Sequence, residues 1–147
     1  MITGANHMNL VVSDMDTSFA FYKDVLGLTP LCRSKASAYF LVGEKGKPGE
    51  LWLSLDWDRE GVRRPSPCNT HLAFSVPQDL FDAFVTRLKN AGLASYKDNT
   101  SPGDSFYFLD PDGHKLEIHT GTWQARLAAR KQDPGPWEDV VWFCHGA

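Results

Sequence analysis

Two histidines and one glutamate, far apart in the sequence, are of the chemical types that hold a divalent metal ion. His7 and His71 stand at matching places in two similar runs of sequence, and Glu117 lies later in the second half of the chain. Imidazole and carboxylate groups suit Mn²⁺, Fe²⁺, Co²⁺, Ni²⁺ and Zn²⁺, and three protein ligands leave coordination positions open for a substrate. The three residues form no local motif, so the prediction depends on the repeat that positions them.

The repeat pairs residues 6–12 with residues 70–76. Each run is strand-like and is followed by a helical pattern. The helical patterns stop at Gly27 and Gly92, residues of the type that ends helices. The offset between the two histidines is 64 (71 minus 7), and the offset between the two glycines is 65 (92 minus 27). The two halves therefore align as copies of one module.

Three further strands are expected after each helix. They are residues 29–33, 38–42 and 51–55 in the first half, and 93–97, 106–109 and 115–119 in the second. The run Asp110-Pro111-Asp112-Gly113 predicts a hairpin turn. In the last strands an offset of 65 makes Trp52 the counterpart of Glu117, so the first module lacks a fourth ligand.

We therefore expect an α+β protein in which two tandem βαβββ modules form a cupped mixed sheet around the metal site. A helix covers one face of each module, and a concave junction of this kind favours a ligand site. We expect a single domain of residues 1–147, with modules at about 4–55 and 70–121, a linker at 56–69 that is rich in charge and proline, and a C-terminal helix (123–131) and tail within 122–147.

The composition argues against several classes of partner. The chain of 147 residues has a net charge of -3 and a pI of about 5.9, so it offers no basic surface for nucleic acid. It has no apolar run long enough to cross a membrane and no basic and apolar signal segment at its start, so we expect a cytoplasmic protein. The three cysteines, Cys32, Cys68 and Cys144, are expected to be reduced thiols.

The segment from Lys97 to Glu117 resembles the signature of the fosfomycin resistance glutathione transferases, which belong to the vicinal-oxygen-chelate superfamily. So do Thr3-Gly4-x-Asn6-His7 and Thr70-His71-x-Ala73-Phe74, and the resemblance covers about residues 1–132. It implies the vicinal-oxygen-chelate fold and a homodimer. It also implies an enzyme that uses Mn²⁺, is activated by K⁺ and adds a thiol, glutathione, to the epoxide of fosfomycin, which confers antibiotic resistance.

The resemblance also assigns roles to residues of this chain. The metal ligands are His7, His71 and Glu117. The phosphonate-binding residues are Lys97, Ser101, Ser105, Tyr107 and Arg126, together with Asn9, which stands where the family has threonine. The potassium loop contains Ser101, Gly103 and Ser105. Tyr39 and Arg33 lie near the thiol, and Trp52 lies in the wall of the site. Related epoxide hydrolases have a glutamate base where this chain has Ser37, which disfavours hydrolysis.

The chemistry of these residues agrees with that assignment. Lys97 and Arg126 supply positive charge for a phosphonate dianion, and hydroxyl groups donate to its remaining oxygens. A metal ion acts as a Lewis acid on the epoxide oxygen, and the thiol attacks as its thiolate. Three alternatives stay open: a glyoxalase-like activity, an Fe²⁺-dependent ring-cleaving dioxygenase, and a non-catalytic drug-binding protein of the same fold.

Overall fold

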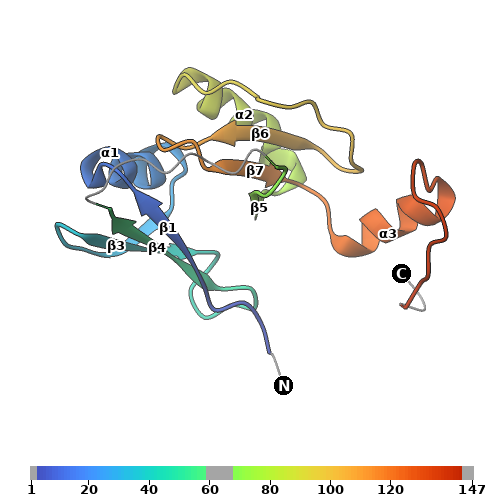
Figure 1. Cartoon of the computed structure of the whole chain (residues 1–147), viewed down its shortest axis with the longest axis horizontal. Helices are drawn as coiled ribbons and strands as arrows, with labels where there is room; N and C mark the ends of the chain where they lie inside the picture. Colours follow the sequence, from blue (N-terminus) through green and yellow to red (C-terminus); the bar gives the residue numbers. More distant parts are fainter. Residues whose placement is uncertain (1–2, 59–67, 144–147) are drawn as a thin grey trace. The chain divides into compact units, whose positions relative to one another are not determined.

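The computed structural model describes residues 3–58 and 68–143 (Figure 1). The chain divides into two compact units. Unit 1 comprises Met1–Thr70 and Leu109–Lys115, and unit 2 comprises His71–Phe108 and Leu116–Ala147. The α+β class expected from the sequence is confirmed, and each unit is described by itself.

Unit 1 contains a four-stranded mixed sheet. Its strands lie in the order β1 (His7–Val12), β4 (Leu51–Trp57), β3 (Ser37–Val42) and β2 (Thr29–Arg33). β1 runs parallel to β4, and the other neighbours are antiparallel. Side chains alternate between the two faces of a strand, so Ala38, Phe40 and Leu53 share the face that is fully buried.

A short helix covers that buried face of unit 1. Helix α1 (Met15–Ala20) continues into the π-helical segment η1 (Phe21–Val25). Asp14 caps α1 by accepting a hydrogen bond of 2.7 Å from the backbone N–H of Thr17. The ring of Phe19 packs 5.1 Å from that of Phe40. Gly27 follows the helix with a φ of +76°, as its predicted role as a stop requires.

The predicted hairpin turn at Asp110-Pro111-Asp112-Gly113 belongs to unit 1, although it connects two strands of the second module. The carboxylate of Asp112 accepts from the backbone N–H of Ser13 at 3.1 Å and from the hydroxyl of Ser18 at 3.3 Å. Ser13 precedes helix α1, and Ser18 lies within it. The turn therefore supplies a buried carboxylate next to the start of that helix.

Unit 2 contains a three-stranded sheet, in the order β5 (Leu72–Ser75), β7 (Lys115–His119) and β6 (Ser105–Leu109). β5 runs parallel to β7. The 3₁₀ turn η2 (Gln78–Leu80) leads into α2 (Phe81–Asn90), whose Leu88 is fully buried and whose Lys89 lies over the ring of Phe106 at 5.9 Å. Helix α3 (Trp123–Gln132) begins at Thr122, whose hydroxyl accepts from Ala125.

The prediction of a strand at residues 93–97 is wrong. This segment is irregular, and it is linked to β6 by the backbone hydrogen bond from Tyr96 to Tyr107 at 3.1 Å. The hydroxyl of Ser95 donates to the backbone carbonyl of Lys97 at 2.6 Å. Local bonds between a serine side chain and the backbone compete with a strand ladder. The second module therefore has the order βαββ, with an irregular segment in place of one strand.

The register of the strands also corrects the symmetry inferred from the sequence. Glu117 pairs with Ala73 in unit 2, and the counterpart of Ala73 at an offset of 64 is Asn9. Asn9 pairs with Ser54. The structural counterpart of Glu117 is therefore Ser54, and Trp52, which an offset of 65 indicated, pairs with His7.

Other boundaries and exclusions follow from the described residues. β4 extends to Trp57, so the predicted linker begins later than residue 56, and its residues 59–67 lie outside the described part of the chain. Cys32 and Cys68 are exposed and, within the described residues, form no disulfide, as predicted, and Cys144 lies outside the described residues. In the described ranges, each helix is too short or too polar to cross a membrane.

Candidate metal and phosphonate site

The polar face of the unit 2 sheet carries several of the residues nominated from the sequence. Phe106, Phe108, Leu116 and Ile118 are buried, and Lys89 of α2 packs on the first of them. Because side chains alternate along a strand, the residues between them point to the other face. These residues are Ser105 and Tyr107 on β6 and Glu117 and His119 on β7.

His71 and Glu117 lie in direct contact on this face. Nε2 of His71 is 2.8 Å from Oε2 of Glu117, and the glutamate is only 3% exposed. An imidazole nitrogen and a carboxylate oxygen are both donor types that divalent cations accept as ligands. Such a cation replaces the hydrogen that the two groups otherwise share. The two residues therefore fit the metal predicted from the sequence.

The second carboxylate oxygen of Glu117 is held by a hydroxyl group. Ser105 donates to Oε1 of Glu117 at 2.6 Å, and its oxygen lies 2.8 Å from Nδ1 of His119. Arg126 on α3 reaches the other ring nitrogen, with Nη2 3.3 Å from Nε2 of His119. His119 was not among the residues nominated from the sequence, where it reads only as the end of a strand.

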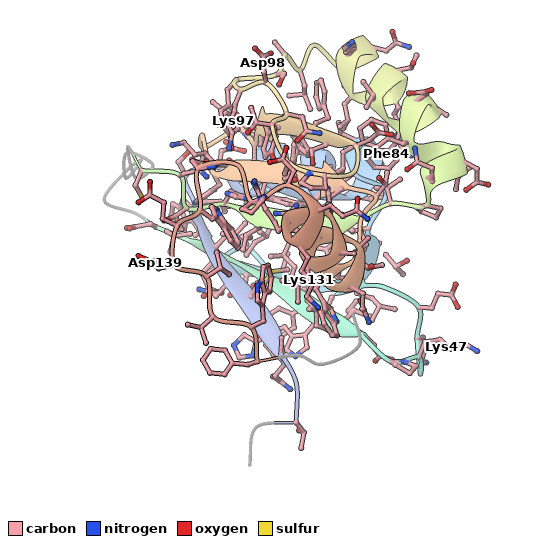
Figure 2. All side chains as sticks on the ribbon, turned by 90° about the vertical axis from the view of Figure 1, so that its right-hand side faces the viewer. Lys47, Phe84, Lys97, Asp98, Lys131 and Asp139 are labelled. Carbon is pink, nitrogen blue, oxygen red and sulfur yellow. The ribbon has the colours of Figure 1, made fainter. Side chains whose placement is uncertain are left out.

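The remaining phosphonate-binding candidates of unit 2 gather around Tyr107. Nζ of Lys97 lies 4.6 Å from the centre of the Tyr107 ring, a cation–π contact, and the hydroxyls of Ser101 and Tyr107 are 3.5 Å apart. Figure 2 shows Lys97 beside Asp98 on the segment between α2 and β6. Burial, reinforced by the charge of Glu117, raises the pKa of Tyr96, whose ring lies 6.0 Å from that of Tyr107.

Asn99 organises the loop that contains Ser101 and Gly103. Its Oδ1 accepts from the backbone N–H and the hydroxyl of Ser101, each at 3.0 Å, and its Nδ2 donates to the carbonyl of Gly103 at 2.7 Å. Gly103 has a φ of +85°, which only glycine adopts readily. The sequence offered a signal for Asn99, because asparagine two residues before a serine favours an Asx turn.

His7 lies in unit 1, stacked on Trp52. The two ring centres are 4.3 Å apart with an angle of 16° between the planes, and Nδ1 of His7 is 2.8 Å from Oδ1 of Asn6. Tyr39 packs on Trp52, with their ring centres 4.7 Å apart. Asn9 lies two residues further along β1, on the same face as His7. One face of the unit 1 sheet thus carries the nominated residues His7, Asn9, Tyr39 and Trp52.

Arg33 does not accompany Tyr39. It pairs with Ala38, which faces the helix, whereas Tyr39 pairs with Cys32 and Ser54. The guanidinium of Arg33 lies 4.7 Å from the ring centre of Phe19 and pairs with Asp16. It lines a pocket of about 410 Å³ on the helix side of the sheet. Unit 1 therefore separates the two residues that the resemblance assigned to the thiol.

Within the described residues, no three histidine, cysteine, aspartate or glutamate side chains are grouped as a metal site. Unit 2 supplies His71 and Glu117, and His7 belongs to unit 1.

Comparison with known proteins extends these observations. Residues 4–118 match the Glyoxalase/Bleomycin resistance protein/Dioxygenase superfamily. The chain is 43% identical over 136 residues to the glutathione transferase FosA of Serratia marcescens, a match that covers 91% of this chain and 92% of FosA. It is 42% identical over 136 residues to the metallothiol transferase FosB of Shouchella clausii, covering 87% of each protein.

Solved structures of fosfomycin resistance proteins share the fold. A mutant of FosX from Listeria monocytogenes, complexed with Mn(II) and 1S,2S-dihydroxypropylphosphonic acid, is 26% identical with a TM-score of 0.73, covering 88% of this chain and 98% of that one. FosX from Mesorhizobium loti is 28% identical with a TM-score of 0.68, covering 86% and 99%. The chain therefore belongs to the Glyoxalase/Bleomycin resistance protein/Dioxygenase superfamily, in the family of the thiol transferases FosA and FosB.

Proposed function

We propose that this protein is a metal-dependent thiol transferase that opens the epoxide of fosfomycin by adding glutathione. The observation that carries the proposal is the polar face of unit 2, which holds the His71–Glu117 pair and Tyr107, with Lys97 packed on the Tyr107 ring and Arg126 of α3 bonded to His119. The identity of 43% to a glutathione transferase supports the choice of reaction and of thiol. A function of this kind would confer resistance to the antibiotic.

The proposed metal ligands are His7, His71 and Glu117, with Mn²⁺ as the proposed ion. The Mn(II) in a FosX structure of the same fold supports this choice over Zn²⁺, Ni²⁺, Co²⁺ or Fe²⁺. When bound, the ion supplies the positive charge that stabilises a developing alkoxide. The ligand pair in unit 2 is already oriented, because Ser105 holds the second carboxylate oxygen of Glu117 at 2.6 Å.

The proposed phosphonate donors are Lys97, Arg126, Ser101, Tyr107 and Asn9. Lysine and arginine provide two positive charges for a dianion, and the hydroxyl and amide groups donate to its oxygens. Ser105 has a single hydrogen, which it donates to Glu117. We therefore give Ser105 a role in orienting the metal ligand. As part of the loop that contains Ser101 and Gly103, it also lines the proposed K⁺ site.

The reaction is the addition of a thiolate to an epoxide carbon. The C–S bond forms as the C–O bond breaks, and the resulting alkoxide takes up the proton that the thiol released. Binding both reactants in one site removes most of the entropic cost of their encounter. Tyr39, whose side chain is 37% exposed beside Trp52, is proposed to face the thiol. Arg33 would join it only by leaving Phe19 and Asp16.

Hydrolysis is the second candidate, because the FosX structure holds a dihydroxypropylphosphonic acid. In this chain the position of the hydrolase base is Ser37, whose hydroxyl donates to Asp56 at 2.6 Å. A hydroxyl in that arrangement supplies no base for water, which favours the thiol reaction. We also propose that the protein acts in the cytoplasm as a homodimer.

Product identification separates these candidates. Purified protein with Mn²⁺ and K⁺ would be incubated with fosfomycin and either glutathione, cysteine or water alone, and products read by NMR and mass spectrometry. We expect a glutathione adduct that disappears in Glu117→Gln and persists in the exposed control Glu50→Gln. A cysteine adduct alone would identify cysteine, and not glutathione, as the thiol substrate. A diol would establish hydrolysis, and no product from folded, metal-loaded protein would refute the proposal.

A further inference from the structure

His119 occupies a slot that two glycines leave open. A Cβ atom added to Gly103 would lie 2.9 Å from the imidazole, and one added to Gly121 would lie closer still. Real Cβ atoms essentially never make such contacts, so any other residue at either position would displace the ring. The imidazole is only 13% exposed. The fold therefore holds this side chain in one place on the polar face of unit 2.

The slot places the imidazole in a continuous chain of hydrogen bonds. Arg126 Nη2 is 3.3 Å from Nε2 of His119, Nδ1 is 2.8 Å from the Ser105 hydroxyl, and that hydroxyl donates to Glu117 at 2.6 Å. His119 and Glu117 are 3.6 Å apart at their closest nitrogen and oxygen atoms, so the serine bridges them.

Only one direction of donation satisfies every member of the chain. The guanidinium of Arg126 can only donate, so Nε2 of His119 accepts. The neutral imidazole then carries its hydrogen on Nδ1 and donates it to Ser105. The serine in turn has one hydrogen, which goes to Glu117. Each group thus fixes the orientation of the next, from the arginine to the carboxylate.

We infer that His119 is a positioning residue, which keeps the Ser105 hydroxyl turned toward Glu117 and links Arg126 to that carboxylate. The inference rests on the proposed function for its consequence, since Glu117 is a proposed metal ligand and Arg126 a proposed phosphonate donor. When a residue that holds a metal ligand by a hydrogen bond is removed, the affinity for the metal typically falls about 10- to 100-fold.

Two amide substitutions separate the two ring nitrogens. The side chain of His119→Asn places an N–H near the position of Nδ1 and retains the donor to Ser105. The side chain of His119→Gln places its carbonyl near Nε2, where it accepts from Arg126, and loses the donor to Ser105. Mn²⁺ dissociation constants would be measured by electron paramagnetic resonance of the free ion, with melting temperatures recorded for each variant.

We expect His119→Asn to bind Mn²⁺ within about threefold of wild type, and His119→Gln and Ser105→Ala to bind about 10- to 100-fold more weakly. The double variant of His119→Gln and Ser105→Ala should bind Mn²⁺ no more weakly than Ser105→Ala alone, because both substitutions break the same link from His119 through Ser105 to Glu117. In the metal-free protein, ¹⁵N shifts of the His119 ring should report hydrogen on Nδ1.

Three results would overturn the inference. The first is a His119→Gln variant that binds Mn²⁺ with wild-type affinity. The second is an equal loss of Mn²⁺ affinity in both amide variants that parallels a fall in their melting temperatures. The third is a His119 ring that carries its hydrogen on Nε2. Wild-type protein that binds no Mn²⁺ would refute the proposed metal site as well, so the two failures are distinguishable.

Discussion

Tyr22 donates a hydrogen bond of 2.8 Å to Asp110, a residue 88 positions further along the chain. Tyr22 is fully buried, and the side chain of Asp110 is fully buried as well. The same carboxylate accepts from the backbone N–H groups of Asp112 and His114 and lies 2.7 Å from Nδ1 of His114. Burial, reinforced by the charge of Asp110, holds the pKa of Tyr22 well above its ordinary value.

Removal of the Tyr22 hydroxyl should destabilise the protein. Tyr22→Phe deletes one buried hydrogen bond to a carboxylate, which costs about 1.5–3 kcal/mol in the free energy of unfolding. Urea denaturation would measure the change, with Tyr39→Phe as a control because that side chain is 37% exposed. Equal stability of Tyr22→Phe and wild type would show that the buried pair contributes nothing.

His114 should make stability depend on pH. Its hydrogen bond to Asp110 raises the pKa of His114 above the ordinary value, so the folded protein holds this proton more tightly than the unfolded chain. The stabilisation is fully present below the unfolded pKa of about 6.5 and is lost as the pH rises through the folded pKa. The wild-type free energy of unfolding should fall over that range relative to His114→Gln, which does not titrate. Parallel curves for the two proteins would contradict the assignment.

Lys97 should control the affinity for fosfomycin. Lys97→Met removes a charge that is proposed to meet the phosphonate, and the loss of a charged hydrogen bond of about 1.5–3 kcal/mol corresponds to a rise in KM of about 10- to 100-fold. Lys47→Met is the matched control, since Lys47 lies on an exposed loop of unit 1 (Figure 2). Steady-state kinetics would compare them, and an equal effect of both substitutions would argue against a specific contact.

Trp52 should report whether His7 binds the metal. The paramagnetic Mn²⁺ ion quenches nearby fluorophores, and the indole of Trp52 stacks 4.3 Å from the His7 ring. We expect Mn²⁺, but not diamagnetic Mg²⁺, to quench wild-type fluorescence, and Trp52→Phe to lose that part of the quenching while still binding Mn²⁺. Quenching that is unchanged in Trp52→Phe would place the ion away from His7.

A methyl group at Gly121 should disturb the polar face of unit 2. Gly121→Ala pushes against the His119 ring, and overpacking of this kind costs about 1–3 kcal/mol. Gly4→Ala is the control, because an added Cβ there meets nothing within 4 Å. We expect a lower melting temperature and weaker Mn²⁺ binding only for the first variant. A Gly121→Ala protein that matches wild type in both measurements would mean that the ring has room to move.

The local elements follow from the sequence because their patterns are local. The strands at residues 29–33 and 115–119 have the predicted limits, and Gly27 and Gly92 both adopt positive φ where the helices stop. The sequence also nominated His71 and Glu117 together, and the structure brings their side chains to 2.8 Å. A repeat offset locates equivalent strands, but it does not fix the register to the residue.

Tertiary structure decided which faces and registers these residues occupy. A shift of one residue in pairing turns a side chain to the other face, and the shift between Pro30 and Cys32 leaves Arg33 paired with Ala38, which faces α1. Pairing also makes Ser54, two residues along the same face from Trp52, the counterpart of Glu117. The contacts of Tyr22 with Asp110 and of His119 with Ser105 join residues 88 and 14 positions apart. Pairings of this kind depend on how the whole chain packs, so no local pattern encodes them.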